Sequence, residues 1–444
     1  MASPLVHVLV INWNGLEHLQ ICFKSLLAST YSNVRFVLID NGSTDGSVAF
    51  VRDNFGDDER VQVLRCGENL GWSGGNNVGL RAAQEAGADY VFLLNNDTAT
   101  AEDAIEKLVA MAEARPEAGA LAPKMLLYDC PFIINSMGLV CSVVGASWDV
   151  GIGRLDGARF SESNLVAGVC GGACFLRTAV LAKTGLLPED FEIYMDDLDL
   201  CLRIWDAGYE VRTCPDAQVR HKFSATLGHG AWARRKYYLN TRNRFRVIIR
   251  NFPLWTWFMV KPAVVVGECR AVGRALLDGE PWRVWAHFRA WFSGAGYLPR
   301  GLWEALRRRR AGVRRGRFWQ LVLKRPMFCP GAAIPDRGWY GTRVLNGLEV
   351  RPMSSQAWED VPGGRLRVRA VNCYPQLGDV EVRVHRGGTE LAFLSTAGEA
   401  EVILDSPGGR IDFGAERIFE AEQTGEIMDL GGWISITTVK DGQT

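Results

Sequence analysis

Short apolar runs alternate with amphipathic segments along the first hundred residues. Four of these runs predict buried strands: Val6–Asn12, Val34–Asp40, Val61–Arg65 and Tyr90–Leu94. Between them, three segments carry apolar residues at helical spacing: Leu16–Ser29, Gly46–Phe55 and Asn76–Gly87. This alternation predicts a parallel sheet that is covered by helices on both faces. Such a sheet binds its ligands beyond the carboxyl ends of the strands.

A polar loop follows each of the four predicted strands. The loops are Asn12-Trp13-Asn14-Gly15, Asp40-Asn41-Gly42-Ser43-Thr44-Asp45-Gly46-Ser47, Glu68–Gly79 and Asn95-Asn96-Asp97-Thr98. One such loop is an ordinary turn or helix cap. Four of them at the same edge of one sheet indicate a ligand site.

Each loop has a chemical and a purely structural interpretation. Asp40 can accept hydrogen bonds from a base or a ribose, or it can be a turn residue or the cap of the helix near Gly46. The four glycines of Asn69–Gly79 would let backbone N–H groups approach a pyrophosphate, although the spacing matches neither GxGxxG nor a Walker A loop. Asn95-Asn96-Asp97 offers oxygen ligands for a hard divalent cation, or forms an Asx-turn.

Carboxylates gather a second time at Asp196, Asp197 and Asp199, in the first turn of a predicted helix. The helix dipole favours carboxylates there, so simple capping explains them. A carboxylate beside a cleft would equally serve as a general base. His221 follows a short strand-like run, and a lone histidine is more often a structural residue than a metal ligand.

Taken together, these motifs resemble those of a known enzyme family. The resemblance rests on the polar loops above, on Asp196-Asp197-Leu198-Asp199, on His221 and on Arg242-Asn243, in this order over about 250 residues. The pattern is similar to that of family 2 glycosyltransferases of the GT-A fold, particularly the bacterial rhamnosyltransferases and galactofuranosyltransferases.

The resemblance implies a Rossmann-like nucleotide-sugar-binding domain that transfers a sugar with inversion. The residues that it assigns to the donor nucleotide are Asn12, Trp13, Asn14, Asp40, Asn69, Gly74, Asn76, Asn95 and Asn96. It implies that Asp97 and His221 bind Mg²⁺ or Mn²⁺ and that Asp197 is the general base. Acceptor or supporting roles fall to Asp196, Asp199, Arg203 and Arg242.

Two positions depart from the family pattern. Asn95 and Asn96 stand where relatives often have carboxylates, which lowers the negative charge of the implied metal site and makes metal binding more dependent on the donor phosphates. Asp196 stands where many relatives have Glu, with the same charge and a shorter reach.

The 444-residue chain has 50 basic and 50 acidic residues and no net charge, but the two kinds of residue are unevenly distributed along it. Residues 1–233 carry a net charge of −12, residues 234–325 of +18 and residues 326–444 of −6. With 48% hydrophobic residues the chain is not disordered as a whole. We predict three parts: a catalytic domain over 1–250, a basic helical segment over 251–325 and an antiparallel β-sandwich accessory domain over 326–444.

The basic segment is also rich in tryptophan, with seven of the 15 in the chain between residues 234 and 325. Basic residues mixed with Trp and Phe predict amphipathic helices at an anionic membrane surface. Docking against the acidic catalytic domain is the alternative. The apolar run Phe252–Gly267 is short for a membrane span, and no nucleic-acid-reading motif accompanies the charge. For the β-sandwich, a glycan-binding or assembly role is a hypothesis only.

The 11 cysteines form no CxxC pair and no Cys/His ligand spacing, so we expect free thiols in a reducing cytoplasm. The N-terminus reads directly into a strand, which argues against secretion. The sequence thus predicts a cytoplasmic enzyme, peripheral at the inner face of the membrane. It would transfer rhamnose or galactofuranose from a dTDP- or UDP-sugar to a saccharide or lipid-linked acceptor in bacterial surface polysaccharide synthesis. The alternatives are a non-catalytic glycan-binding protein and another nucleotide-binding α/β enzyme.

Overall fold

The computed structural model describes most of the chain. The described residues are 3–222, 231–310, 316–324, 331–332, 343–345, 348–353, 356–371, 379–397, 399–415, 419–423, 426–430 and 432–438. The chain divides into two compact units. The first comprises Met1–Tyr128, Asn135–Gly151 and Ala158–Cys329, and the second comprises Asp129–Ile134, Ile152–Gly157 and Pro330–Thr444.

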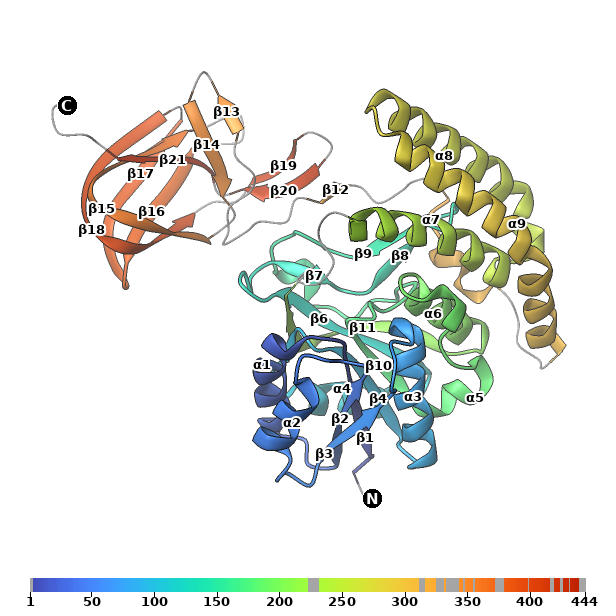
Figure 1. Ribbon diagram of the computed structural model, residues 1–444. Coiled ribbons are helices and arrows are strands. Elements are labelled where there is room, and N and C mark those ends of the chain that lie inside the picture. Colours follow the sequence, from blue (N-terminus) through green and yellow to red (C-terminus); the bar gives the residue numbers. More distant parts are fainter. Residues whose placement is uncertain are drawn as a thin grey trace. The chain divides into compact units, whose positions relative to one another are not determined.

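A nine-stranded mixed sheet forms the centre of the first unit (Figure 1). Its strands are β1 (Val6–Asn12), β2 (Val34–Asp40), β3 (Val61–Arg65), β4 (Tyr90–Asn95), β5 (Thr98–Thr100), β6 (Ala118–Leu127), β7 (Ile134–Ser136), β10 (Ala173–Arg177) and β11 (Glu210–His221). The order is β3-β2-β1-β4-β10-β6-β11-β5, and β7 pairs with β6. Strands β1 to β4 are parallel, as predicted, whereas β10 runs antiparallel between β4 and β6.

Helices cover both faces of this sheet. They are α1 (Leu16–Leu27), α2 (Ser47–Phe55), α3 (Gly71–Glu85), α4 (Ala104–Ala114), α5 (Leu181–Thr184) and α6 (Asp196–Asp206). Alternate residues of β1 enter two separate cores, because successive side chains of a strand point to opposite faces. Val8 and Val10 pack with Phe23 of α1, while Leu9 packs with Leu80 of α3. Burial on both faces explains the near-continuous apolar strands.

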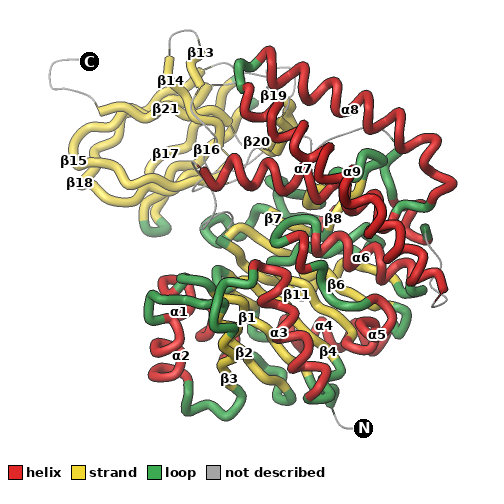
Figure 2. Tube along the Cα trace, turned by 45° about the vertical axis from the view of Figure 1, so that its right-hand side comes forward, coloured by secondary structure: helices red, strands yellow, loops and turns green. Residues whose placement is uncertain are grey.

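Three long helices follow the sheet. They are α7 (Ala231–Asn251), α8 (Trp257–Leu277) and α9 (Pro281–Arg310), and α8 and α9 pack together (Figure 2). The basic segment is therefore helical, as predicted, and it belongs to the first unit. Within the described residues, no helix is both long and apolar enough to cross a membrane. The boundaries at residues 250 and 325 stay predictions.

A small two-stranded sheet and five short 3-10 helices complete the described secondary structure before the β-strands of the second unit. A two-stranded sheet pairs β8 (Leu139–Cys141) with β9 (Ser147–Asp149). The short 3-10 helices are η1 (Ala158–Phe160), η2 (Thr178–Val180), η3 (Glu189–Phe191), η4 (Leu254–Thr256) and η5 (Arg317–Leu321).

The nine cysteines in the described part of the chain are free, and only Cys269 among them is exposed.

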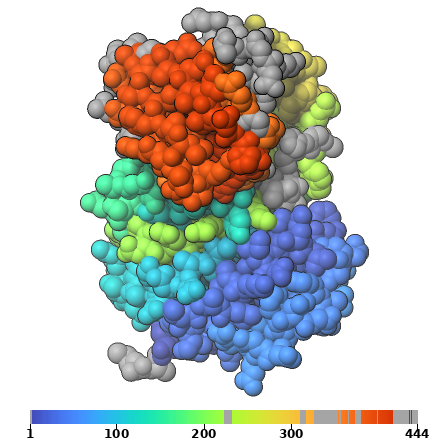
Figure 3. Space-filling model, turned by 90° about the vertical axis from the view of Figure 1, so that its left-hand side faces the viewer, coloured from blue at the N-terminus to red at the C-terminus, as the bar shows by residue number. Residues whose placement is uncertain are grey.

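Among the described residues from 331 to 438, the second unit is built of strands, as predicted, and Figure 3 shows them in orange and red. Its strands are β12 (Gly331–Ala332), β13 (Arg343–Leu345), β14 (Leu348–Met353), β15 (Gln356–Val371), β16 (Val380–Arg386), β17 (Thr389–Thr396), β18 (Glu399–Ala415), β19 (Phe419–Gln423), β20 (Glu426–Leu430) and β21 (Gly432–Thr438). A seven-stranded sheet, β13-β14-β21-β15-β18-β16-β17, is antiparallel throughout. In the smaller sheet, β12 is parallel to β20.

Candidate active site

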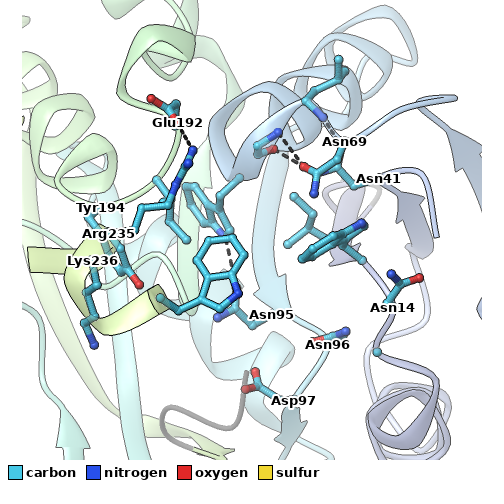
Figure 4. A pocket seen from close by; sticks show the side chains of 18 of the residues that line it. Asn14, Asn41, Asn69, Asn95, Asn96, Asp97, Glu192, Tyr194, Arg235 and Lys236 are labelled. Carbon is cyan, nitrogen blue, oxygen red and sulfur yellow. Dashed lines mark hydrogen bonds and ion pairs between the residues drawn. The ribbon is translucent and has the colours of Figure 1, made fainter. Parts of the chain in front are cut away.

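A cavity of about 650 Å³ lies beyond the carboxyl ends of β1 and β4, in the size range of small-molecule sites. Figure 4 shows asparagines from the strand-end loops facing side chains of α7 across it. Six of the residues predicted from the sequence line this cavity: Trp13, Asn14, Asn69, Asn95, Asn96 and Asp97. A cavity therefore lies at the edge of the sheet where the sequence predicts a ligand site.

Hydrogen bonds made by asparagine side chains join the loops that follow β1, β2 and β3. The amide of Asn41 donates to Asn69 Oδ1 at 3.1 Å and accepts the Leu70 N–H at 3.0 Å. The side-chain oxygen Asn14 Oδ1 accepts the Thr44 N–H at 2.8 Å. These bonds fix the wall of the cavity before any ligand is present, which reduces the ordering cost of binding.

Asp40 and Asn12 lie buried behind this wall and do not line the cavity. Asp40 Oδ1 accepts the Ser43 N–H at 3.0 Å, and Asn12 Nδ2 donates to Ser43 Oγ at 3.1 Å. In this structure both side chains therefore hold the turn after β2, which for Asp40 is the turn role that its structural interpretation allows, and neither caps α2.

The glycine-rich segment is helical where a loop was predicted, and this corrects the predicted helix start at Asn76. Helix α3 begins at Gly71. A Cβ at Gly79 would lie 2.4 Å from Ile39 Cδ1, and one at Gly75 would lie 2.8 Å from Ile11 Cδ1. These two glycines let the helix approach the sheet closely. Gly74 and Asn76 are buried in the same helix and do not line the cavity.

Asp97 and His221 come together at one end of the cavity. Asp97 Oδ1 lies 3.2 Å from His221 Nε2, and the residues are 9% and 8% exposed. His221 Nδ1 lies 2.7 Å from Asn135 Oδ1. Because that amide oxygen can only accept, the proton of a neutral ring belongs on Nδ1, and the Nε2 lone pair then faces a carboxylate oxygen. Two electron-pair donors at this distance require a shared cation or proton.

Asp97 and His221 fit a divalent metal ion as two of its ligands, but two ligands do not complete a coordination sphere. Asp97 Oδ1 is a buried oxygen without a hydrogen-bond partner. Among the described residues, no group of three His, Cys, Asp or Glu side chains could hold a metal by itself. The chain therefore offers one carboxylate and one imidazole, and other ligands would have to complete the coordination sphere.

Asp196 and Asp197 form a carboxylate pair at the start of α6. Asp197 Oδ2 accepts the Gly171 N–H at 2.9 Å, and the Asp196 carboxylate accepts the Ser73 hydroxyl. Burial raises the pKa of Asp197 to about 7, and the charge of Asp196 adds to the shift. Burial also raises the pKa of Asp196 to about 6. A carboxyl group with a pKa near neutrality is suited to proton transfer.

Asp197 does not line the cavity itself; Gly171 relates it to the cavity residue Trp72. A Cβ at Gly171 would lie 2.7 Å from the Trp72 ring and 3.4 Å from Asp197 Oδ2, so the backbone of Gly171 lies against both groups. Trp72 Nε1 donates to Asn95 Oδ1 at 3.1 Å. The indole ring therefore connects the Asn95-Asn96-Asp97 loop to the carboxylate pair.

The loop before α6 is held in an unusual conformation. Glu192, Tyr194 and Met195 all have positive φ (68°, 71° and 66°), although none is glycine. Such residues persist only where their surroundings enforce them. Asn243 of α7 donates to the carbonyls of Phe191, Ile193 and Tyr194 at 2.9 to 3.0 Å. The strain thus lies directly before the Asp196–Asp197 pair.

Arg242 supports the same loop. It donates to Glu192 Oε1 at 2.9 Å and to the Phe191 carbonyl at 2.9 Å. Asp199 and Arg203 are fully buried and lie away from the cavity. Arg203 Nε donates to Asp199 at 2.8 Å, and Arg250 Nε of α7 donates to the other carboxylate oxygen at 2.9 Å. The ion pair between Asp199 of α6 and Arg250 of α7 therefore joins the two helices.

Several residues of the site were not singled out from the sequence. They are Trp72, Gly171 and three α7 residues that line the cavity, Trp232, Arg235 and Lys236. Arg235 pairs with Glu192, and Lys236 lies over the Tyr194 ring (Figure 4). The available signal was the run Arg234-Arg235-Lys236, which we interpreted as the start of a membrane-facing segment.

Comparison with known proteins shows which family the N-terminal part of the chain is similar to. Residues 7–183 match the family model "Glycosyl transferase family 2". This part of the chain is thus similar to family 2 glycosyltransferases, as the sequence motifs predicted, and its sheet is mixed and flanked by helices.

Three of the relatives match about half of the chain. It is 28% identical over 248 residues to the N-acetylglucosaminyl-diphospho-decaprenol L-rhamnosyltransferase of Mycobacterium tuberculosis, covering 51% of this chain and 78% of that protein. Over 239 residues it is 29% identical to the uncharacterized protein y4gI of Sinorhizobium fredii, covering 51% of this chain but only 25% of that protein. The hexosyltransferase Agl10 of Haloferax volcanii is 24% identical over 243 residues, covering 54% and 73%.

Solved structures resemble the chain more distantly. A structure of GalNAc-T7 with UDP, GalNAc and Mn²⁺ has a TM-score of 0.48 at 16% identity, and covers 64% of this chain and 54% of that one. The mannosyltransferase PcManGT of Pyrobaculum calidifontis, with GDP-Man and Mn²⁺, has a TM-score of 0.42 at 18% identity, and covers 67% and 87%.

Proposed function

We propose that this protein is an inverting glycosyltransferase that transfers a sugar from a nucleotide diphosphate donor to a saccharide or lipid-linked acceptor in bacterial surface polysaccharide synthesis. Rhamnose and galactofuranose are the favoured sugars. The observation that carries the proposal is the pairing of Asp97 with His221 at one end of a cavity that Trp72 connects to a carboxylate of raised pKa.

The donor would occupy the cavity between the asparagine-rich loops and α7. Trp13 offers a ring face to the base, and Asn14 and Asn69 offer amides to the ribose. Arg235 and Lys236 line the opposite side and would attract the diphosphate. Asp40 and Asn12, which the family resemblance assigns to the nucleotide, do not line this cavity and would act by holding Ser43 in the turn beside Asn14.

Asp97 and His221 would hold Mg²⁺ or Mn²⁺, and Asn135 would orient the imidazole. When bound, such an ion neutralises charge on the departing diphosphate. The amides Asn95 and Asn96 add no negative charge, so the donor phosphates would complete the ligand set.

Asp197 would act as the general base. It would take the proton from the acceptor hydroxyl while that oxygen bonds to the anomeric carbon, on the face opposite the bond to the diphosphate. The carbon–oxygen bond to the diphosphate breaks in the same displacement, and its electron pair leaves with the nucleotide. One displacement with one base inverts the anomeric centre.

The experiment is a donor screen with the full chain. Incubation with dTDP-rhamnose, UDP-galactofuranose and UDP-hexoses in Mn²⁺ or Mg²⁺, with saccharide and lipid-linked acceptors, should release nucleotide diphosphate for one donor. Product analysis by NMR should show inversion. Binding of a glycan without turnover of any donor would instead establish the non-catalytic alternative, and retention of configuration would exclude Asp197 as the base.

The proposal also includes a membrane partner at the inner face of the cytoplasmic membrane, since a lipid-linked acceptor would be reached there. The basic, tryptophan-rich helices α8 and α9 support it. No role is proposed for the second unit.

A further inference from the structure

Exposed hydrophobic side chains are concentrated on one part of the first unit. Twelve of the twenty large hydrophobic side chains that are exposed among the described residues lie between Leu254 and Leu306. Soluble proteins rarely gather such side chains in one region unless a partner covers them. On α8, for example, Phe258 and Val265 are two turns apart and both exposed.

Helix α9 shows the pattern most clearly. Trp285, Phe292 and Trp303 are 65%, 78% and 60% exposed, and Phe288 and Leu306 lie on the same side of the helix at spacings of three or four residues. From Trp285 to Leu306 this apolar row extends over about 32 Å. It is long enough to contact a broad surface.

A row of arginines runs beside the apolar row. Arg289, Arg300 and Arg307 are exposed at intervals of 11 and seven residues, which places them along one line of the helix. An amphipathic helix of this composition, with aromatic residues next to cations, is suited to the interface of an anionic membrane.

A second cavity, of about 620 Å³, lies at the end of the same row. It is lined by Arg300, Trp303 and Arg307 of α9 and, from the other side, by Arg81 of α3 and Lys183 of α5. Seven cationic and three carboxylate side chains line it, and the buried Asp199 binds two of the cations from behind. The cavity therefore keeps a cationic excess, although several of its arginines are paired.

This cavity is separate from the candidate active site. Its α3 residues, Asn77 and Arg81, follow Trp72 by five and nine positions, so they lie about 8 to 14 Å farther along the helix. The two sets of lining residues share no member. The catalytic mechanism proposed above does not use it.

We propose that α9 docks on an anionic phospholipid bilayer and that the second cavity receives a phosphate headgroup from that bilayer. Phe292 and Trp303 enter the boundary between headgroups and acyl chains, while Arg307 and Lys183 bind the phosphate. This surface defines the membrane partner of the proposed function, but its test needs no catalysis.

Charge favours a bilayer over a second copy of this chain. In a symmetric contact through α9, the arginine row would meet the arginine row of the other copy, and like charges would repel. An anionic lipid surface pairs with the same row favourably.

The test is co-sedimentation of the full chain with vesicles. We expect binding to vesicles that contain phosphatidylglycerol and little binding to pure phosphatidylcholine. The variant K183Q/R307Q should bind about 25-fold more weakly, since each cation near an anionic surface contributes about a fivefold factor. The variant F292S/W303S should lose binding to the phosphatidylglycerol vesicles. Matched controls are Arg52→Gln and Phe393→Ser, both on exposed positions outside this surface.

Three results would overturn the proposal. The first is wild-type protein that does not bind phosphatidylglycerol vesicles. The second is a dimer, seen by light scattering, that F292S/W303S converts to a monomer. The third is stabilisation by inorganic phosphate that K183Q/R307Q abolishes while vesicle binding is unchanged. Turnover of a soluble acceptor should be the same in both double variants, so failure of docking is distinguishable from failure of the proposed chemistry.

Discussion

Asp197 is the side chain on which the proposed chemistry depends most. Replacing it with asparagine keeps the size but removes the base, so we expect kcat to fall by about 10²–10⁴-fold, with little change in the KM for the donor. Steady-state kinetics on the donor found in the screen would measure this. The control is Asp216→Asn, an exposed aspartate on β11. Full activity of Asp197→Asn would disprove the mechanism.

The raised pKa of Asp197 predicts the pH dependence of that activity. Only the deprotonated carboxylate can accept a proton, so kcat/KM should decrease as the pH falls through about 7. Burial is the main cause of the raised pKa and the charge of Asp196 the next. Asp196→Asn removes that charge, which lowers the pKa of Asp197 and should move the acidic limb to lower pH. If the decrease of kcat/KM at acidic pH stays at the same pH in this variant, the Asp196–Asp197 pair does not control it.

Asn135 is a less obvious residue of the candidate metal site. It accepts from His221 Nδ1 and so keeps the Nε2 lone pair directed toward Asp97. Loss of such an orienting partner typically weakens metal binding by about 10–100-fold. We therefore expect Asn135→Ala to raise the Mn²⁺ concentration required for activity by that factor, measured by metal titration. Asn135→Asp keeps an acceptor and should restore it; an equal defect in both variants would contradict this role.

At the scale of elements, α7 connects the basic helices to the catalytic carboxylates. Its Asn243 holds the strained turn before α6, and its Arg250 meets Asp199 inside α6. Although burial alone would raise it, Arg250 and Arg203 hold the pKa of Asp199 well below its usual range. The carboxylate is therefore ionised across the neutral pH range and stabilises the fold there.

Asp199→Ala should destabilise the first unit, because it leaves Arg203 and Arg250 as buried charges without their carboxylate. Breaking a buried ion pair in this way costs about 3–5 kcal/mol. Urea denaturation followed by tryptophan fluorescence would measure the loss, with the exposed Asp53→Ala as control. The difference should shrink in strong acid, since wild-type Asp199 loses its charge as the pH falls through its depressed pKa. A change below 1 kcal/mol would show that the network contributes little.

At the scale of the whole molecule, charge is segregated along the chain while the net charge is zero. Long-range attraction between exposed charges depends on ionic strength: the screening length falls from about 30 Å at about 0.01 M to about 3 Å at about 1 M. Vesicle binding by the full chain should therefore weaken strongly over this range, whereas turnover of a soluble acceptor should change little. Co-sedimentation and nucleotide release at matched salt would compare the two, and salt-independent binding would exclude an electrostatic contribution.

The local sequence pattern was enough to predict the first elements of the chain and the ligand edge of the sheet. Alternation of apolar runs predicted β1, β2 and β3 with their observed bounds, because hydrophobic periodicity is a local property. The polar residues after β1 and β4 were placed at one cavity for the same reason: parallel strands end at a common edge.

Only the tertiary structure decided which polar residues face that cavity and which support it. Asp40 and Asn12 turned out to hold a turn, Gly75 and Gly79 let α3 pack on the sheet, and Arg235 reached the cavity from a helix more than 130 residues beyond Asn95. Spacing along the chain cannot show these differences, since burial and the pKa of Asp197 depend on neighbours that are distant in sequence. The physical reason is that packing and electrostatics act through space, whereas a sequence pattern records only what is adjacent along the chain.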